Sequence, residues 1–267
     1  MQSNLFPNFK KYSCQGLAAL GIVAACCQTA GATSHFTLAD GWTEIAAEDN
    51  VGTGGFVGPG VGGQPFDAEY LAYKLVGNTL SIGLQSGFDL LDGHVLQGGI
   101  NYYAGDLALS FNGTPTNYEY AFDFGKLTKN YAGAKVDADT SGSDGIDAAG
   151  LYAVSAWNLG VYSGYTASNP FAMDGGTLVT SGTTLAGLDG DSYWRTVSFD
   201  ITALGLTNNF SFDAHWTMSC GNDAINGGAN VAYNPPPTPV PEPATMLLFG
   251  TGLMGLAGLH RRKMNKA

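Results

Sequence analysis

The sequence predicts an all-β fold, an antiparallel β-sandwich or jelly roll, between two apolar ends. The chain of 267 residues contains 39 Gly, and only 12% of its residues are charged. Long amphipathic helices favour Ala, Glu and Lys, whereas short strands and tight turns suit a chain rich in Gly, Thr, Asn and Tyr. Short alternating runs recur without a fixed repeat length, which argues against a solenoid or a propeller. We therefore expect many short strands in two packed sheets.

The first 32 residues have the features of a secretory signal peptide. Lys10 and Lys11 form a basic start, residues 17–25 form a short apolar run, and residues 30–32 (Ala-Gly-Ala) match an A-x-A cleavage site. We therefore expect an N-terminal signal helix that directs export through the Sec machinery and is then removed. An alternative stays open, because the segment ending at Cys26 resembles a lipoprotein cleavage box, in which case Cys26 would carry lipid.

Residues 33–233 are expected to form the body. The clearest signal in it is a hairpin. Residues 69–76 and 79–84 are runs with alternating apolar side chains, and they flank the dipeptide Gly77-Asn78. A two-residue Gly-Asn turn between two such runs is typical of a β-hairpin. Further strands are expected at 42–45, 106–111, 118–124, 150–157, 192–201 and 209–218.

The body is strongly acidic. Between residues 33 and 239 it has five basic residues against 21 acidic ones, a formal charge of −16. Such a surface repels nucleic acid and anionic lipid, so we expect no nucleic-acid partner. Cys220 is the one cysteine of the body, which excludes an internal disulfide framework.

One acidic stretch, residues 137–147, is a candidate calcium loop. Its closely spaced oxygen-bearing side chains, together with Gly142, allow a loop to wrap round a hard cation. It is not an EF-hand, because Ala148 stands where that loop requires a bidentate Glu. An ordinary polar surface loop is the alternative. The candidate ligands are Asp137, Asp139, Ser141, Ser143, Asp144 and Asp147.

No catalytic signature stands out, and we expect a protein that is not an enzyme. His215, Cys220 and Asp223 are of the right types for Cys–His chemistry, but a structural turn that ends the strand is the favoured interpretation. Three acidic pairs could act as glycosidase couples, which only their separation in space can decide: Asp89/Asp92, Asp189/Asp191 and Glu48/Asp49. Eight aromatic residues could form a sugar-stacking platform or fill the core: Tyr102, Tyr103, Tyr152, Trp157, Tyr162, Tyr165, Tyr193 and Trp194.

The C-terminal end has three parts in a fixed order, after a Pro-rich spacer at 234–240. The segment 241–267 begins with a Pro-Glu-Pro tripeptide, continues with an uncharged apolar run at 244–259 and ends in a basic cluster. The run has 16 residues, whereas a bilayer core requires about 20. We therefore expect a short transmembrane helix that holds the chain in the inner membrane transiently, with its basic end in the cytoplasm. The motif residues are Val240, Pro241, Glu242, Pro243, Arg261, Arg262 and Lys263.

These three parts closely resemble the PEP-CTERM sorting signal of exported bacterial proteins. The resemblance implies recognition by a membrane-embedded exosortase, which would remove the tail near residues 241–243. Segments of the body at 68–75, 102–109 and 215–223 also resemble a family of exosortase-dependent surface proteins. That resemblance implies delivery to the surface but supplies no catalytic residues.

We therefore expect an exported protein at the cell surface or in the extracellular matrix of a Gram-negative bacterium. Its expected role is structural or adhesive, with exopolysaccharide or biofilm as its setting. A carbohydrate-binding module, with calcium as its cofactor, is the first alternative, and a secreted hydrolase is the second.

Overall fold

The computed structural model describes residues 33–48, 61–114, 117–125, 148–159, 168–235 and 248–256. Within these residues the body consists of antiparallel strands with three short 3-10 turns, η1 (Leu38–Asp40), η2 (Gln64–Phe66) and η5 (Ile201–Leu204). The strands form a five-stranded, a six-stranded and a two-stranded sheet. The predicted all-β, antiparallel fold is therefore confirmed. The predicted signal peptide, residues 1–32, lies outside the described residues.

The five-stranded sheet combines strands from three parts of the chain. Its order is β1 (Thr43–Ala47), β2 (Ala68–Val76), β3 (Thr79–Ser86), β11 (Ser192–Asp200) and β10 (Thr183–Asp189). The predicted hairpin is its centre, since β2 pairs with β3 in the register Val76↔Thr79. Gly77 has φ 59°, a left-handed conformation that Gly adopts without the steric cost of a Cβ.

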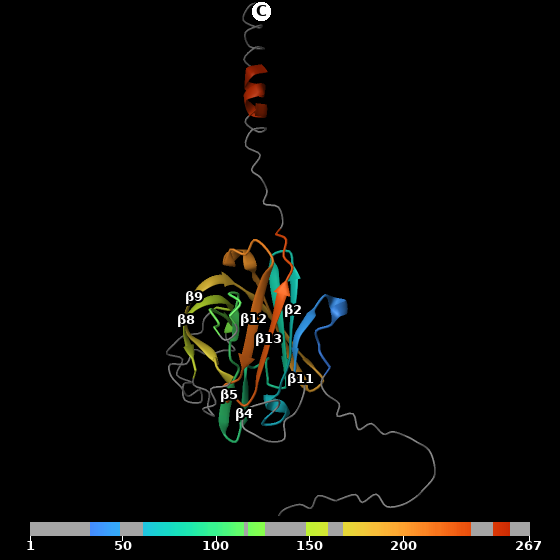
Figure 1. Ribbon diagram of the computed structural model, residues 1–267, viewed down its shortest axis with the longest axis vertical. Helices are drawn as coiled ribbons and strands as arrows, with labels where there is room; N and C mark the ends of the chain where they lie inside the picture. The colour runs from blue at the N-terminus through green and yellow to red at the C-terminus, as the bar shows by residue number, and fades with distance from the viewer. Residues whose placement is uncertain are drawn as a thin grey trace, which may run out of the picture. The chain divides into compact units, whose positions relative to one another are not determined.

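The six-stranded sheet contains a meander of four consecutive strands. Its order is β13 (Ala224–Val231), β12 (Phe210–Thr217), β6 (Leu107–Ser110), β7 (Tyr120–Asp123), β8 (Gly150–Asn158) and β9 (Ala172–Ser181). Figure 1 shows β12 and β13 side by side and β8 and β9 along one side of the body. A separate hairpin joins β4 (His94–Gln97) to β5 (Ile100–Tyr103).

One hydrophobic core joins the two large sheets. Inward-facing residues of the five-stranded sheet, such as Leu71 and Val197, belong to the same buried cluster as Leu109, Phe122 and Trp216 of the six-stranded sheet. This two-layer arrangement agrees with the predicted sandwich. A jelly roll is not confirmed, because β6 to β9 follow one another within one sheet as a meander.

The two sides of the body, where the sheets meet, differ. On one side β1 and β13 approach so closely that a Cβ on Gly227 would lie 2.9 Å from the carbonyl oxygen of Ile45. On the other side the chain passes from β9 to β10 through Gly182, where a Cβ would meet the Phe122 ring at 2.4 Å. β9 and β10 are therefore the end strands of their sheets on this second side, which we call the β9–β10 rim.

All six of the additional predicted strands have a counterpart, but five further strands, β4, β5, β9, β10 and β13, were not predicted. The counterparts are β1, β6, β7, β8, β11 and β12. Of the others, β9, β10 and β13 contain Gly, β9 and β10 also contain Thr, and all three lack regular apolar alternation, so their periodicity gave no signal. Tertiary pairing with β8, β11 and β12 makes them strands instead.

Candidate functional site

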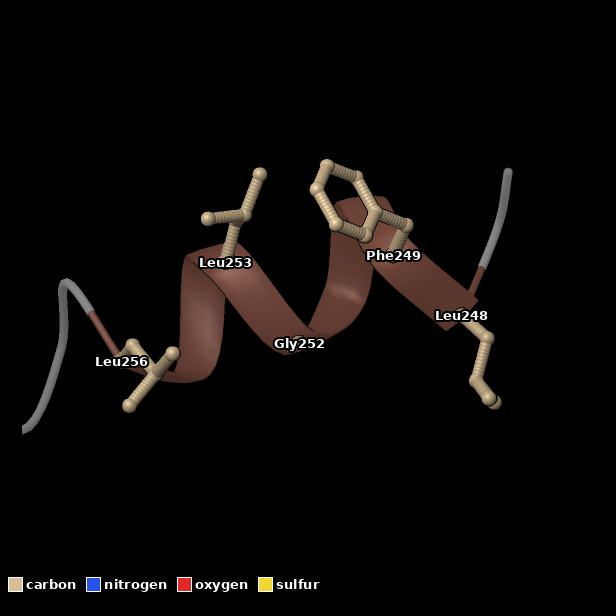
Figure 2. Close-up of a pocket in the computed structure, with 5 residues that line it drawn as sticks. All are labelled: Leu248, Phe249, Gly252, Leu253 and Leu256. Atoms are coloured by element: carbon tan, nitrogen blue, oxygen red, sulfur yellow. The ribbon is translucent and has the colours of Figure 1, made fainter. Parts of the chain in front are cut away.

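The apolar C-terminal run contains a helix at residues 248–256. Figure 2 shows Phe249 and Leu253 on one side of it and Leu248 and Leu256 at its ends, around a shallow hollow at Gly252. The hollow exists because Gly252 has no side chain and nothing lies within 4 Å of where its Cβ would be. The apolar side chains are 53–74% exposed.

A helix that exposes all of its large apolar side chains favours a lipid or protein environment. The helix includes part of the predicted run of 16 residues, which as a full helix would measure about 24 Å, against a hydrocarbon core of about 30 Å. Among the described residues, no helix is long and apolar enough to cross a membrane. The flanking motif residues, Val240 to Pro243 and Arg261 to Lys263, lie outside the described residues.

A second notable site is a buried polar network that the sequence did not reveal. The carboxyl group of Glu69, a fully buried residue, accepts hydrogen bonds from Gln64 Nε2 at 2.8 Å, Ser192 Oγ at 2.7 Å and Gln85 Nε2 at 2.9 Å. A β-bulge between Ala68 and Tyr70 displaces Glu69 from the regular register.

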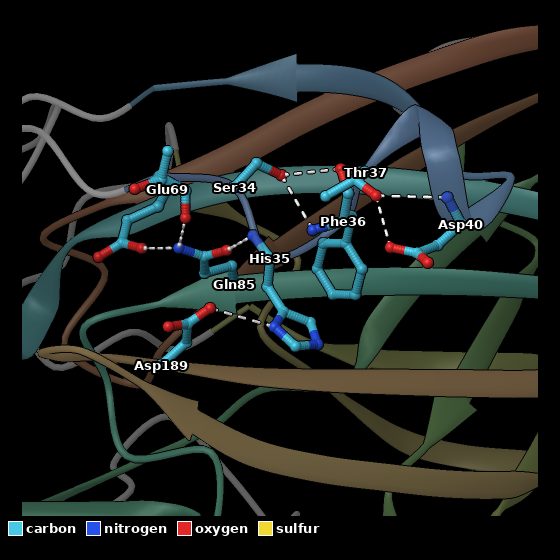
Figure 3. Close-up of polar contacts among 9 residues, drawn as sticks. Ser34, His35, Phe36, Thr37, Asp40, Glu69, Gln85 and Asp189 are labelled. Atoms are coloured by element: carbon cyan, nitrogen blue, oxygen red, sulfur yellow. Dashed lines mark hydrogen bonds and ion pairs between the residues drawn. The ribbon is translucent and has the colours of Figure 1, made fainter.

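The first residues of the body, 33–37, cover this network, and we call them the N-terminal strap. Gln85 connects the two, because its Nε2 also donates to the Thr33 carbonyl at 3.0 Å and its Oε1 accepts from the His35 amide at 2.6 Å. Figure 3 shows this chain of contacts from Glu69 through Gln85 to His35 and Asp189. The His35 ring stacks on Trp194 with centroids 4.2 Å apart. The strap is thus an integral part of the fold.

His215, Cys220 and Asp223 have structural partners. His215 is buried, and its Nε2 lies 3.1 and 3.0 Å from the carbonyl oxygens of Ser168 and Pro170, so this nitrogen donates. Burial raises the pKa of the Cys220 thiol to about 12, which keeps it protonated and unsuited to nucleophilic attack. Asp223 accepts from the amides of Ala68 and Ala224. The turn interpretation therefore explains these residues.

The aromatic side chains pack mainly inside the body. In the described part of the body, every Phe, Tyr and Trp is buried or half-buried. Tyr103 and Tyr152 are buried, the indole of Trp157 donates to the Tyr118 carbonyl at 2.8 Å, and His35 covers Trp194. A flat, open aromatic platform is thus not found among the described residues, and Tyr162 and Tyr165 lie outside them.

The acidic residues considered as glycosidase pairs or calcium ligands lie in different parts of the chain. Asp89 Oδ1 accepts from the amides of Leu91 and Asp92, both at 2.9 Å, and thereby closes a turn. Asp189 Oδ2 lies 3.2 Å from His35 Nδ1. The candidate calcium loop, with Asp137, Asp139, Ser141, Ser143, Asp144 and Asp147, lies outside the described residues, as does Asp49. Within the residues that are described, no group of three or more His, Cys, Asp and Glu side chains could hold a metal ion.

Comparison with known families identifies the tail. The model of the PEP-CTERM protein-sorting motif matches residues 239–263, which include all three parts of the predicted signal. The chain carries a PEP-CTERM protein-sorting motif. No curated protein and no solved structure matches the chain.

The PEP-CTERM match confirms the predicted sorting signal but does not extend to the body. Body segments 68–75, 102–109 and 215–223 lie outside the matched residues, so the family resemblance there stays a prediction. The motif implies a protein that is exported, anchored in the membrane before processing, and processed by an exosortase.

The body of this PEP-CTERM protein also contains a carboxyl group that should titrate near neutral pH. Burial, and to a lesser degree the charge of Asp223, raises the pKa of Glu48 to about 7 from an ordinary value of 4.5. Between these values the folded chain binds more protons than the unfolded chain, so this group lowers stability as the pH rises from about 4.5 through 7. We expect Glu48→Gln to remove this part of the pH dependence of the melting temperature, measured from pH 4.5 to 8.

Glu44→Gln, a change of an exposed carboxylate on β1, is the matched control and should keep the wild-type slope. Burial lowers the pKa of His215 from its ordinary value of 6.5. This shift has the opposite effect on stability, because it destabilises the fold as the pH falls below 6.5. The comparison of each variant with wild type isolates Glu48 from this effect. An identical slope in Glu48→Gln and wild type would contradict the assignment.

Proposed function

We propose that this protein is a non-enzymatic component of the bacterial cell surface or extracellular matrix, with a structural or adhesive role in exopolysaccharide or biofilm. The observation that carries the proposal is the sorting motif at 239–263. In this proposal the Sec machinery exports the chain and the inner membrane holds it through residues 244–259. An exosortase then removes the tail and releases a β-sandwich body to the surface.

The acidic body supports this role. Its formal charge of −16 between residues 33 and 239 keeps copies soluble outside the membrane and suits contact with cations rather than nucleic acid. The protonated Cys220 thiol and the backbone-capping Asp223 favour a non-catalytic role for the cluster around His215. The N-terminal strap supports a body that begins directly after the predicted cleavage site at residues 30–32.

The processing step is tested by mass spectrometry of the full chain expressed in a host with an exosortase. We expect mature wild-type protein to lack the peptide that contains Arg261 and Arg262, and a host without exosortase to retain it in the inner membrane. The double change Glu242→Ala and Pro243→Ala should also retain the tail. Pro236→Ala, in the preceding spacer, is the control and should be processed normally. Mature wild-type protein that still carries Arg261 in the inner membrane would contradict the proposal.

The role at the surface requires a separate measurement. A strain that lacks the protein should form a weaker biofilm, and wild-type chain but not the Glu242/Pro243 variant should restore it. Because a structural component acts in proportion to its amount, adhesion should increase with the quantity of protein incorporated. Full restoration by a trace of protein would indicate an enzyme instead.

A further inference from the structure

Most of the β9–β10 rim is uncharged. Residues 175–188 form a run of 14 residues without a charged side chain, between Asp174 and Asp189. This run supplies most of β9 and β10, the end strands of the two large sheets. Natural proteins commonly protect such edges with charged residues or Pro, since an end strand offers unpaired amides and carbonyls.

The rim also exposes apolar side chains. Leu185 is 69% exposed and Leu188 57% exposed on β10, and Leu178 on β9 is 44% exposed. Among the described strands, none pairs with the outer edge of β10 or of β9. The opposite side of the body differs, because β1 and β13 approach each other there across the two sheets.

We propose that β10 pairs antiparallel with β10 of a second copy of the chain, joining two five-stranded sheets into one continuous sheet. The charge distribution permits this partner. Two copies with 21 acidic and five basic residues in each body repel each other, and an end strand whose one charged residue is Asp189 lets them approach at low electrostatic cost. An interface of this kind is isologous, since the same strand serves on both sides of a two-fold axis.

The side chains of β10 are self-complementary in this arrangement. Centred on Ala186, the pairing places Leu185 opposite Gly187 of the second copy and Asp189 opposite Thr183, so no two carboxylates face each other. Gly187 pairs with Trp194 within the sheet, and a Cβ on Gly187 would lie 2.6 Å from the indole. The Trp194 ring therefore lies over Gly187 on the outer face of the sheet.

Leu185 and Gly187 share this outer face, because they are two residues apart on one strand. The exposed Leu185 of one copy would thus lie beside Gly187 and the edge of the Trp194 ring of the other, a ring that is stacked on His35 of its own copy. Such an aliphatic–aromatic pair across strands is a stabilising contact. The two-fold symmetry gives two of these contacts per dimer. The proposal concerns the body alone and is independent of how the tail is processed.

Disulfide trapping of the full chain in an exporting host tests the pairing. Ala186→Cys places a thiol on the two-fold axis, where paired Cα atoms lie about 4.5–5.5 Å apart, within the range of about 4.4–6.8 Å that a disulfide bridges. On non-reducing gels we expect at least tenfold more covalent dimer from Ala186→Cys than from Leu38→Cys, a control at an 83% exposed position on η1. The parent chain, with its own four cysteines, gives the baseline.

A second pair of variants separates edge pairing from random collision. Adding Leu185→Asp to Ala186→Cys should reduce the covalent dimer to the level of the Leu38→Cys control, because it places a carboxylate against the Trp194 ring of an acidic partner. Adding Leu38→Asp, the same change at the control position, should leave the yield unaltered. Equal trapping at positions 186 and 38, or no trapping at 186 in a chain that melts like wild type, would overturn the proposal.

Discussion

Glu69→Ala is expected to destabilise the body by about 3–5 kcal/mol. The change removes the acceptor for three hydrogen bonds, from Gln64, Gln85 and Ser192, in a site where Glu69 itself is fully buried. Leaving each buried donor without an acceptor costs about 1–3 kcal/mol, although local rearrangement recovers part of this. Such a loss is a large fraction of the roughly 5–15 kcal/mol that stabilises a typical domain.

The measurement is urea unfolding of the exported protein, with Glu44→Ala as the control. Glu44 is an exposed carboxylate on β1, and its replacement should change the free energy of unfolding by less than about 0.5 kcal/mol. Glu69→Gln should fall between the two, because its amide keeps one acceptor but places an NH₂ group towards a donor. An unfolding free energy of Glu69→Ala within 1 kcal/mol of the Glu44→Ala value would mean that the network contributes little.

The same variant connects the network to export. Gln85 holds both Glu69 and the Thr33 carbonyl, and Thr33 directly follows the predicted cleavage site at residues 30–32. Loss of Glu69 should therefore loosen the N-terminal strap, and limited proteolysis should cut Glu69→Ala between residues 33 and 42 faster than wild type. The strap would then be a late part of folding that becomes available once the signal peptide has been removed.

The features that the sequence could predict are those whose residues lie close together along the chain. The hairpin of β2 and β3 was readable because its turn and its alternation lie within 16 residues of sequence, from Glu69 to Leu84. The sorting motif was readable for the same reason, since its three parts follow one another along the chain. Recognition by a processing enzyme acts on a linear segment, so no knowledge of the fold was required.

The buried network and the β9–β10 rim could not be predicted, because they depend on pairing across the chain. Glu69 lies 5 residues from Gln64, 16 from Gln85 and 123 from Ser192, and a bulge of one residue decides where its side chain points. β10 has two Thr, one Gly and no strict alternation, and it is a strand because β11 pairs with all seven of its residues. Periodicity reports burial on one face, and a strand at the edge of a sheet is only partly buried.

Gly105→Ala is expected to cost at least about 3 kcal/mol or to prevent folding altogether. Gly105 joins β5 to β6, and a Cβ on it would lie 2.3 Å from the carbonyl oxygen of Phe171 and 2.6 Å from that of Thr217. Both obstacles are backbone atoms, so no side-chain rotation relieves the clash. Both are also held by hydrogen bonds, since the Gly105 amide donates to Thr217 and the Asp106 amide to Phe171, each at 3.1 Å.

The matched control for Gly105→Ala is Gly175→Ala on β9. There the nearest atom to a new Cβ is the Ser155 hydroxyl at 3.1 Å, which can rotate away, so the melting temperature should change by only a few degrees. The indole of the buried Trp216 donates to the Gly105 carbonyl at 3.0 Å, so a displacement there changes the environment of one of the four tryptophans and with it the fluorescence. If Gly105→Ala had the same melting temperature as Gly175→Ala, β6 would have to shift between β7 and β12 without a loss of stability. The tight junction of these strands would then not be required for the fold.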